Sequence, residues 1–142
     1  MSRLRNGSRL AAALLLMATG LAAGCDDSTT TPTTPTNPMT ETLTGTITQN
    51  GVSVQPFNAT AAGNVTATVT TLAPLNTIIV GFSMGTYSGT TCQVVLDNPA
   101  AVQGSILTAN AATAGAFCVR LYDVGNITAG STVNFTVTVV HN

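Results

Sequence analysis

The chain carries very little charge, and this shortage excludes several classes of protein. Charged residues make up 6% of the 142 residues, lysine is absent, and three of the four arginines lie within the first nine positions. A protein that binds nucleic acid through its phosphates needs a basic surface. Beyond Arg9 the chain has one arginine, Arg120, so we do not expect nucleic acid as a partner.

Tryptophan is also absent, and aromatic residues make up only 4% of the chain. Threonine, by contrast, fills roughly one position in five. Threonine, valine, glycine and asparagine with little charge are typical of strands and turns. No segment beyond residue 24 has the spacing of an amphipathic helix, so an all-β protein is predicted.

The sequence has no apolar run long enough to span a membrane. Its longest, residues 10–23, falls short of the roughly 20 residues that a spanning helix needs. A basic start followed by a short apolar run predicts a secretory signal peptide over residues 1–24. The letters "LAAGC" at residues 21–25 resemble the lipobox of bacterial lipoproteins. That resemblance implies cleavage before Cys25 and lipidation of Cys25 with fatty acyl chains such as palmitate; an ordinary secreted protein is the alternative.

Residues 25–38 are rich in threonine and proline and predict a disordered, lipid-anchored linker. Pro32, Pro35 and Pro38 recur at the three-residue period of polyproline II. Several acyl chains on one cysteine hold a protein firmly to a bilayer. The expected location is therefore the cell envelope, at the outer membrane or cell surface in preference to the inner membrane. The expected partners are the membrane, through Cys25, and an unidentified extracellular or periplasmic ligand.

Residues 39–142 predict an antiparallel β-sandwich or jelly-roll-like domain of about eight strands. Asn50-Gly51 predicts a hairpin between the first two strands, and Pro56 predicts that the second lies at a sheet edge or contains a bulge. Asp97-Asn98-Pro99 predicts a turn. The segments with strand character, bounded by Gly, Asn and Pro, are residues 43–49, 52–57, 63–72, 76–84, 90–96, 105–107, 115–124 and 131–140.

The number of cysteines is small enough to interpret one by one. If lipid occupies Cys25, the mature chain keeps Cys92 and Cys118. Both fall within predicted strands of an exported domain, so a disulfide between them is predicted. His141, near the end of the chain, is expected to be solvated. Two cysteines and one histidine are a poor set of metal ligands, and no metal or cofactor is expected.

The order of features from residue 39 onward resembles the bacterial pre-peptidase C-terminal (PPC-like) domain. The matching stretches are "TLTGTITQNG", "PFNATAAGNVTATVTTL" and "AGAFCVRLYDVGNITAGSTVNFTVTV". Domains of that family are β-sandwiches appended to many secreted proteins, so the resemblance implies a β-sandwich here too. The aspartate-rich middle strand usual in the family is replaced by residues 76–92.

Groups that could perform catalysis are sparse in the domain, and the chain is not expected to be an enzyme. Arg120 and Asp123 lie close enough in sequence to predict a structural ion pair. A calcium site remains an alternative, because oxygen donors occur in the turn regions at Asp97, Asn98, Asp123 and Asn126.

One stretch has the composition of a binding loop. The letters "SMGTYSGTTC" at residues 83–92 surround a single tyrosine with small polar residues. Tyr87, Thr86 and Ser88 are therefore the candidate binding residues; the alternative is that Tyr87 caps one end of the sandwich.

Two hypotheses of function follow. The first is a surface-anchored, non-catalytic binding or adhesion module for a glycan or peptide. The second is a coat or assembly subunit that associates with itself through a strand edge such as the one near Pro56.

Overall fold

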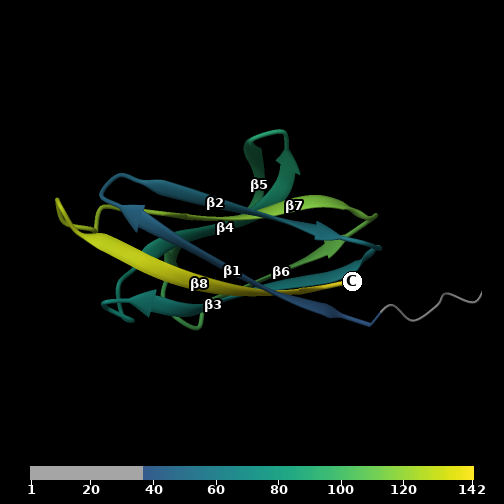
Figure 1. Ribbon diagram of the computed structural model, residues 1–142, viewed down its shortest axis with the longest axis horizontal. Coiled ribbons are helices and arrows are strands. Elements are labelled where there is room, and N and C mark those ends of the chain that lie inside the picture. The colour runs from purple at the N-terminus through teal and green to yellow at the C-terminus, as the bar shows by residue number, and fades with distance from the viewer. Residues whose placement is uncertain (1–36) are drawn as a thin grey trace, which may run out of the picture. The chain divides into compact units, whose positions relative to one another are not determined.

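A computed structural model describes residues 37–142, which form a sandwich of two four-stranded antiparallel sheets (Figure 1). The predicted signal peptide, Cys25 and all but the last two residues of the predicted linker lie outside the described residues. The strands are β1 (Met39–Thr48), β2 (Val52–Ala59), β3 (Gly63–Ala73), β4 (Val80–Ser88), β5 (Thr91–Ala101), β6 (Ile106–Ala111), β7 (Gly115–Tyr122) and β8 (Thr132–His141).

The strand order is that of a jelly roll. The first sheet has the order β1-β8-β3-β6 and the second has the order β2-β7-β4-β5. Successive strands therefore alternate between the sheets, except at the β4–β5 hairpin. This pattern of two interleaved Greek keys is characteristic of eight-stranded jelly rolls. The predicted jelly-roll-like antiparallel sandwich of about eight strands is confirmed.

The core lies between the sheets and follows from alternation along each strand. In β3, Val65, Ala67 and Val69 are buried while the threonines between them face away from the core. The same pattern in the other strands supplies the rest of the core. Its largest fully buried apolar side chains are Phe82, Ile47, Leu121, Val69, Val80, Val119, Val137 and Val139.

The Asn50-Gly51 turn forms as predicted, but it does not join a hairpin. Asn50 has a φ of 53°, the left-handed conformation that asparagine tolerates. However, β1 pairs with β8 and β2 pairs with β7. The turn therefore passes from one sheet to the other, and the predicted pairing of the first two strands is wrong. The edge position predicted from Pro56 is confirmed, because β2 is the outermost strand of the second sheet.

Two further predictions for the middle of the chain are wrong. Residues 83–92 are not a loop, since β4 runs to Ser88, the chain turns at Gly89, which has a φ of 63°, and β5 begins at Thr91. Hydrogen bonding to β7 on one side and β5 on the other keeps this segment extended. Pro99 does not end a strand either. It lies within β5, an edge strand, where a missing N–H is tolerated.

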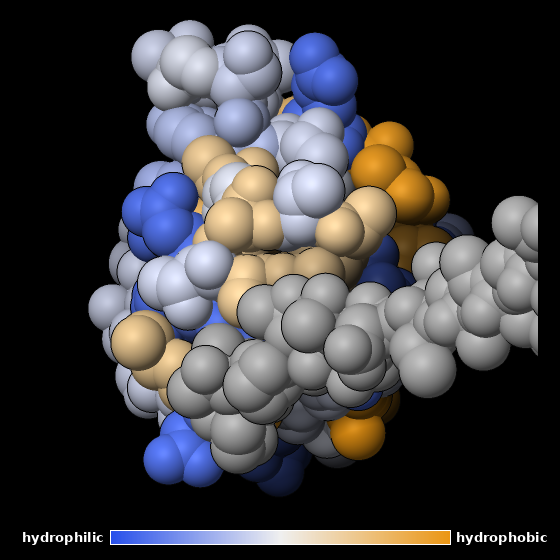
Figure 2. Space-filling view, turned by 90° about the vertical axis from the view of Figure 1, so that its right-hand side faces the viewer, coloured by the Kyte–Doolittle hydropathy of each residue, from blue (hydrophilic) through white to orange (hydrophobic). Residues whose placement is uncertain are grey.

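One end of the sandwich receives the incoming chain. Met39, the first residue of β1, pairs with His141, the last residue of β8. Figure 2 looks onto this end, where small and apolar side chains gather across the middle of the surface. Among the described residues there is no helix of the length and apolarity needed to cross a membrane.

Candidate functional site

Polar side chains gather on the outer face of the second sheet, the face directed away from the core. Arg120 on β7 is the cross-strand partner of Ser83 on β4, and Ser83 is the partner of Asp97 on β5. Val54 on β2 continues this line beyond Arg120. Side chains in register on neighbouring strands share a face. We call Val54, Arg120, Ser83 and Asp97 the outer row.

Tyr122 contacts two members of the outer row, Asp97 and Arg120. Its hydroxyl group is 3.0 Å from both carboxylate oxygens of Asp97. Ser83, whose exposure is 0%, donates a 2.6 Å hydrogen bond to the same carboxylate. The ring of Tyr122 rests on Gly81, where a Cβ atom would lie 2.0 Å from the ring carbon Cζ. Only glycine at position 81 leaves room for this placement.

Arg120 stacks on the tyrosine ring. Its guanidinium carbon is 4.6 Å from the centre of the Tyr122 ring, a cation–π contact. The Nε atom of Arg120 is buried and has no hydrogen-bond partner within the described part of the chain. The side chain is therefore positioned by stacking and not by an ion pair. Within residues 37–142, the one contact between an acidic and a basic side chain at ion-pair distance joins Glu41 to His141.

The electrostatics of the row keep Tyr122 protonated. Burial raises the pKa of Tyr122 above its ordinary value, and the hydrogen bond to Asp97 and the negative charge of Asp97 raise it further. The positive charge of Arg120 opposes this shift but does not reverse it. The phenol therefore remains a hydrogen-bond donor to Asp97 throughout the neutral pH range.

The predicted disulfide is confirmed and stands beside this face. Cys92 of β5 and Cys118 of β7 are bonded, with Cα atoms 5.8 Å apart. Cys118 is two residues before Arg120 and four before Tyr122 in β7, so it lies on the same outer face as both. The bond holds the start of β5, next to the turn at Gly89, to β7. The β4–β5 hairpin arches away from the sandwich in Figure 1.

The candidate binding residues lie on different sides of β4. Tyr87 is half-buried and, by alternation from Ser83, lies on the outer face like Tyr122. Thr86 is turned toward the other face and lines a cavity. Ser88 is exposed at the end of the strand. The role of these three residues in binding stays a prediction.

Asp123 does not pair with Arg120, and the predicted ion pair is wrong. The carboxylate of Asp123 instead accepts backbone N–H groups of Asn50, at 2.9 Å, and of Gly125, Asn126 and Ile127, at 2.9 to 3.1 Å. Burial alone would raise the pKa of Asp123, but these four donors outweigh it and hold the pKa below its ordinary value. Asp123 thus holds the turn before β2 against the loop after β7.

The oxygen donors considered for calcium serve separate structural contacts. Asp97 accepts from Ser83 and Tyr122, while Asn98 accepts from the backbone N–H of Ala100. Asn126 donates its side-chain amide to the carbonyl oxygen of Ile79. Within residues 37–142, no group of three or more His, Cys, Asp or Glu side chains is placed to hold a metal ion.

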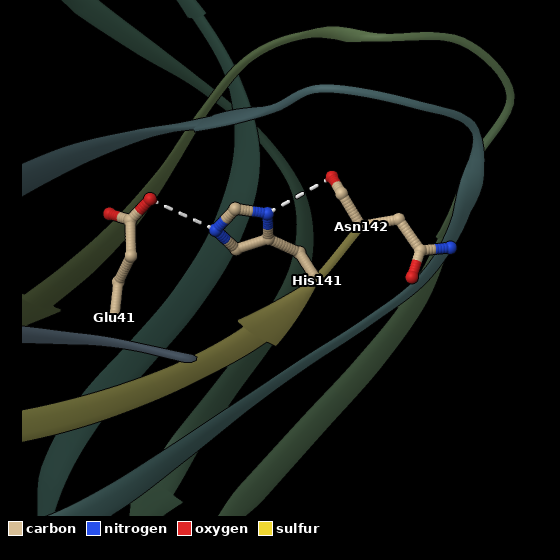
Figure 3. Close-up of polar contacts among 3 residues, drawn as sticks. All are labelled: Glu41, His141 and Asn142. Atoms are coloured by element: carbon tan, nitrogen blue, oxygen red, sulfur yellow. Dashed lines mark hydrogen bonds and ion pairs between the residues drawn. The ribbon is translucent and has the colours of Figure 1, made fainter. Parts of the chain in front are cut away.

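A second polar contact lies at the end where β1 begins, and it corrects the expectation for His141. The side chain is not solvated but fully buried, against the ring of Phe57. Its Nε2 atom is 3.0 Å from the Glu41 carboxylate, and its Nδ1 atom is 3.2 Å from the backbone oxygen of Asn142 (Figure 3). Both ring nitrogens therefore face oxygen acceptors, and burial closes the ring to substrates. The sequence did contain a signal of this burial. Inward-facing residues occur at every second position of β8, and two positions after Val137 and Val139 this period reaches His141.

A cavity of about 270 Å³ opens between the two sheets on the side of edge strands β5 and β6. Apolar side chains dominate its lining, with Met84, Leu96 and Phe117 the largest. The small residues of β6 leave this space unfilled, because Ala109 and Ala111 stand where longer side chains would close it. The cavity is large enough for an apolar side chain of a ligand but offers few groups for recognition.

Comparisons with known proteins bear on the fold. No protein-family model matches the chain, and no curated protein matches its sequence. Among solved structures, the chain is similar to the crystal structure of the Yersinia pseudotuberculosis-derived mitogen (YPM), with a TM-score of 0.55. The match covers 75% of this chain and 88% of the mitogen at 15% sequence identity. At that identity the likeness shows a shared β-sandwich fold.

Proposed function

We propose that the chain is a lipid-anchored protein of the bacterial cell envelope whose jelly-roll domain is a non-catalytic binding module. One observation carries the binding role: Arg120, Tyr122 and Asp97 form a connected polar surface on an open sheet face, and the buried Ser83 is hydrogen-bonded to Asp97. Side chains locked by mutual contacts lose little freedom when they bind a ligand. A surface of this kind suits recognition, whereas the buried His141 is not accessible to a substrate.

The tether is compatible with this assignment. The chain that precedes Met39 enters the domain through β1, an edge strand of the first sheet. The outer row lies on the second sheet. An anchor upstream of Met39 therefore joins the domain on the sheet that does not carry the outer row.

Binding is tested by presenting the full chain to arrays of bacterial and host glycans and of peptides. We expect saturable binding to at least one class of ligand, and we expect Tyr122→Ala to reduce it. Tyr87→Ala is the parallel variant for the hairpin. A chain that binds nothing on either array would contradict the binding function.

The anchor is tested separately by cell fractionation. Cys25→Ser should move the protein from the membrane fraction to the soluble fraction, since it removes the proposed site of acylation. If this variant stays in the membrane fraction like the parent, the anchor lies elsewhere and the lipoprotein assignment fails.

Self-association is the second candidate function, and the free edge of β5 favours it. This strand ends the second sheet and carries Val94 and Val95, which are 40% and 71% exposed. An unprotected edge with apolar side chains is a template for pairing with another chain. Sedimentation velocity over a wide concentration range decides between the candidates. A size that grows with concentration supports assembly, and a constant monomer supports the binding module.

A further inference from the structure

Arg120 is an isolated cation on the outer face of the second sheet. It is the only Lys or Arg among residues 37–142, and no ion pair within those residues includes it. Its guanidinium is stacked on Tyr122, and Tyr122 is itself held by Asp97 and by the floor at Gly81. The planar fork of arginine matches the two oxygens of a carboxylate, and a fork already held in place loses less freedom on binding.

We propose that the outer row binds a saccharide that carries carboxylate groups, of the uronic acid class, with Arg120 contacting the carboxylate. This inference rests on the proposed binding function and adds the class of ligand. The unpaired Nε–H of Arg120 supports it, because a buried donor without a partner is unfavourable and a ligand carboxylate would pair it.

The neighbouring groups favour an acidic saccharide over an acidic peptide. Asp97 lies two strands from Arg120 in the outer row and presents carboxylate oxygens at the surface. A uronic acid ring carries hydroxyl groups that can donate to such oxygens and, on the same ring, a carboxylate that can bind Arg120. A residue of an acidic peptide such as oligoglutamate offers the carboxylate without hydroxyl donors for Asp97.

The binding surface has aliphatic side chains beside the polar ones. Val54 follows Arg120 in the row, and Val52, which is 58% exposed, is the cross-strand partner of Tyr122. The C–H faces of a sugar ring can pack on such side chains while its polar edge meets the row. The surface thus combines one cation, one acceptor and an apolar border, which matches the groups of a uronic acid.

The test is a nuclear magnetic resonance titration of the ¹⁵N-labelled full chain with an oligogalacturonate. The Nε–H signal of Arg120 is identified by its loss in Arg120→Gln. We expect this signal to shift on titration, and we expect Arg120→Gln to weaken binding by about tenfold or more, as for loss of a charge-assisted contact. Arg120→Lys keeps the charge but not the planar fork, so its affinity should lie between those of the parent and of Arg120→Gln.

Two further ligands distinguish a failure of the proposed carboxylate contact from a failure of the proposed saccharide class. The methyl-esterified oligogalacturonate has the same sugar chain with its carboxylates masked, and oligoglutamate has carboxylates on a peptide. Weak binding of both supports the proposal. Equal binding of the methyl ester, or binding that Arg120→Gln does not change, overturns the carboxylate contact but leaves a binding module intact. Stronger binding of oligoglutamate overturns the saccharide class, and no shift with any of the three overturns the whole inference.

Discussion

Replacing Gly81 with alanine tests whether the Tyr122 ring lies where the structure places it. A Cβ atom at position 81 would lie 2.0 to 2.3 Å from three carbons of that ring, far inside contact distance. Without the ring, alanine in an extended strand would stabilise by about 0.5–1 kcal/mol through reduced chain entropy. With the ring, overpacking costs about 1–3 kcal/mol, and displacement of the ring weakens the hydrogen bond to Asp97. We expect a net loss of about 1.5 kcal/mol, or a fall in Tm of about 6–12 °C.

A double-mutant cycle isolates the cause. In a Tyr122→Ala background the clash is gone, so Gly81→Ala should be neutral or stabilising. Thermal and urea unfolding, followed by circular dichroism, give the free energies of unfolding. Gly115→Ala is the matched control, since a Cβ atom there meets only Phe117 at 3.8 Å. An equal cost of Gly81→Ala with and without the Tyr122 ring would refute the reasoning.

Three other predictions concern contacts that hold the sandwich together. Cys118→Ala opens a loop closed over 26 residues and should lower the free energy of unfolding by about 3.5 kcal/mol on the chain-entropy estimate; a change below about 1 kcal/mol in urea denaturation would contradict this. Because the folded-state pKa of Asp123 is lowered, its stabilisation is present above the ordinary carboxyl range and is lost as pH falls through the lowered value. Urea denaturation at several pH values should therefore show a smaller acid loss for Asp123→Ala than for the parent. His141→Phe keeps a ring against the core but leaves Glu41 without its partner, and should cost about 1–3 kcal/mol in the same assay; unchanged stability would show that the pair is not formed.

The strands could be predicted from the sequence because the information is local. From Val65 to Val69 in β3 and from Val133 to Val139 in β8, an apolar residue occupies every second position, and each of these residues is buried as that period requires. The disulfide was predictable for a different reason. Once the anchor is assigned to Cys25, only Cys92 and Cys118 are left to pair. By the same local rule His141 is one of the inward-facing residues of β8. Its burial was missed because a residue so near the end of the chain was expected to be solvated.

The arrangement of strands and the outer row could not be read in the same way. Asn50-Gly51 has the conformation of a hairpin turn, yet it joins two sheets, because β8 and β7 supply the partners of β1 and β2. The pattern of residues within one strand or turn does not indicate which distant strand will pair with it. The contact of Tyr122 with Asp97 likewise depends on the register of three strands and on an absent side chain at Gly81. A glycine in a strand indicates close approach of another group, but the sequence does not say which group.

The scarcity of charge also determines how the outer row can act. Residues 37–142 hold one arginine, Arg120, against three carboxylates, Glu41, Asp97 and Asp123. Asp123 is engaged by backbone donors and Glu41 by His141, so neither forms part of a charged surface. Such a domain creates no broad field that could attract ligands from a distance. In the proposed binding role Arg120 would therefore act at contact, through the shape and hydrogen bonding of its stacked guanidinium, and the rate of association should depend only weakly on salt.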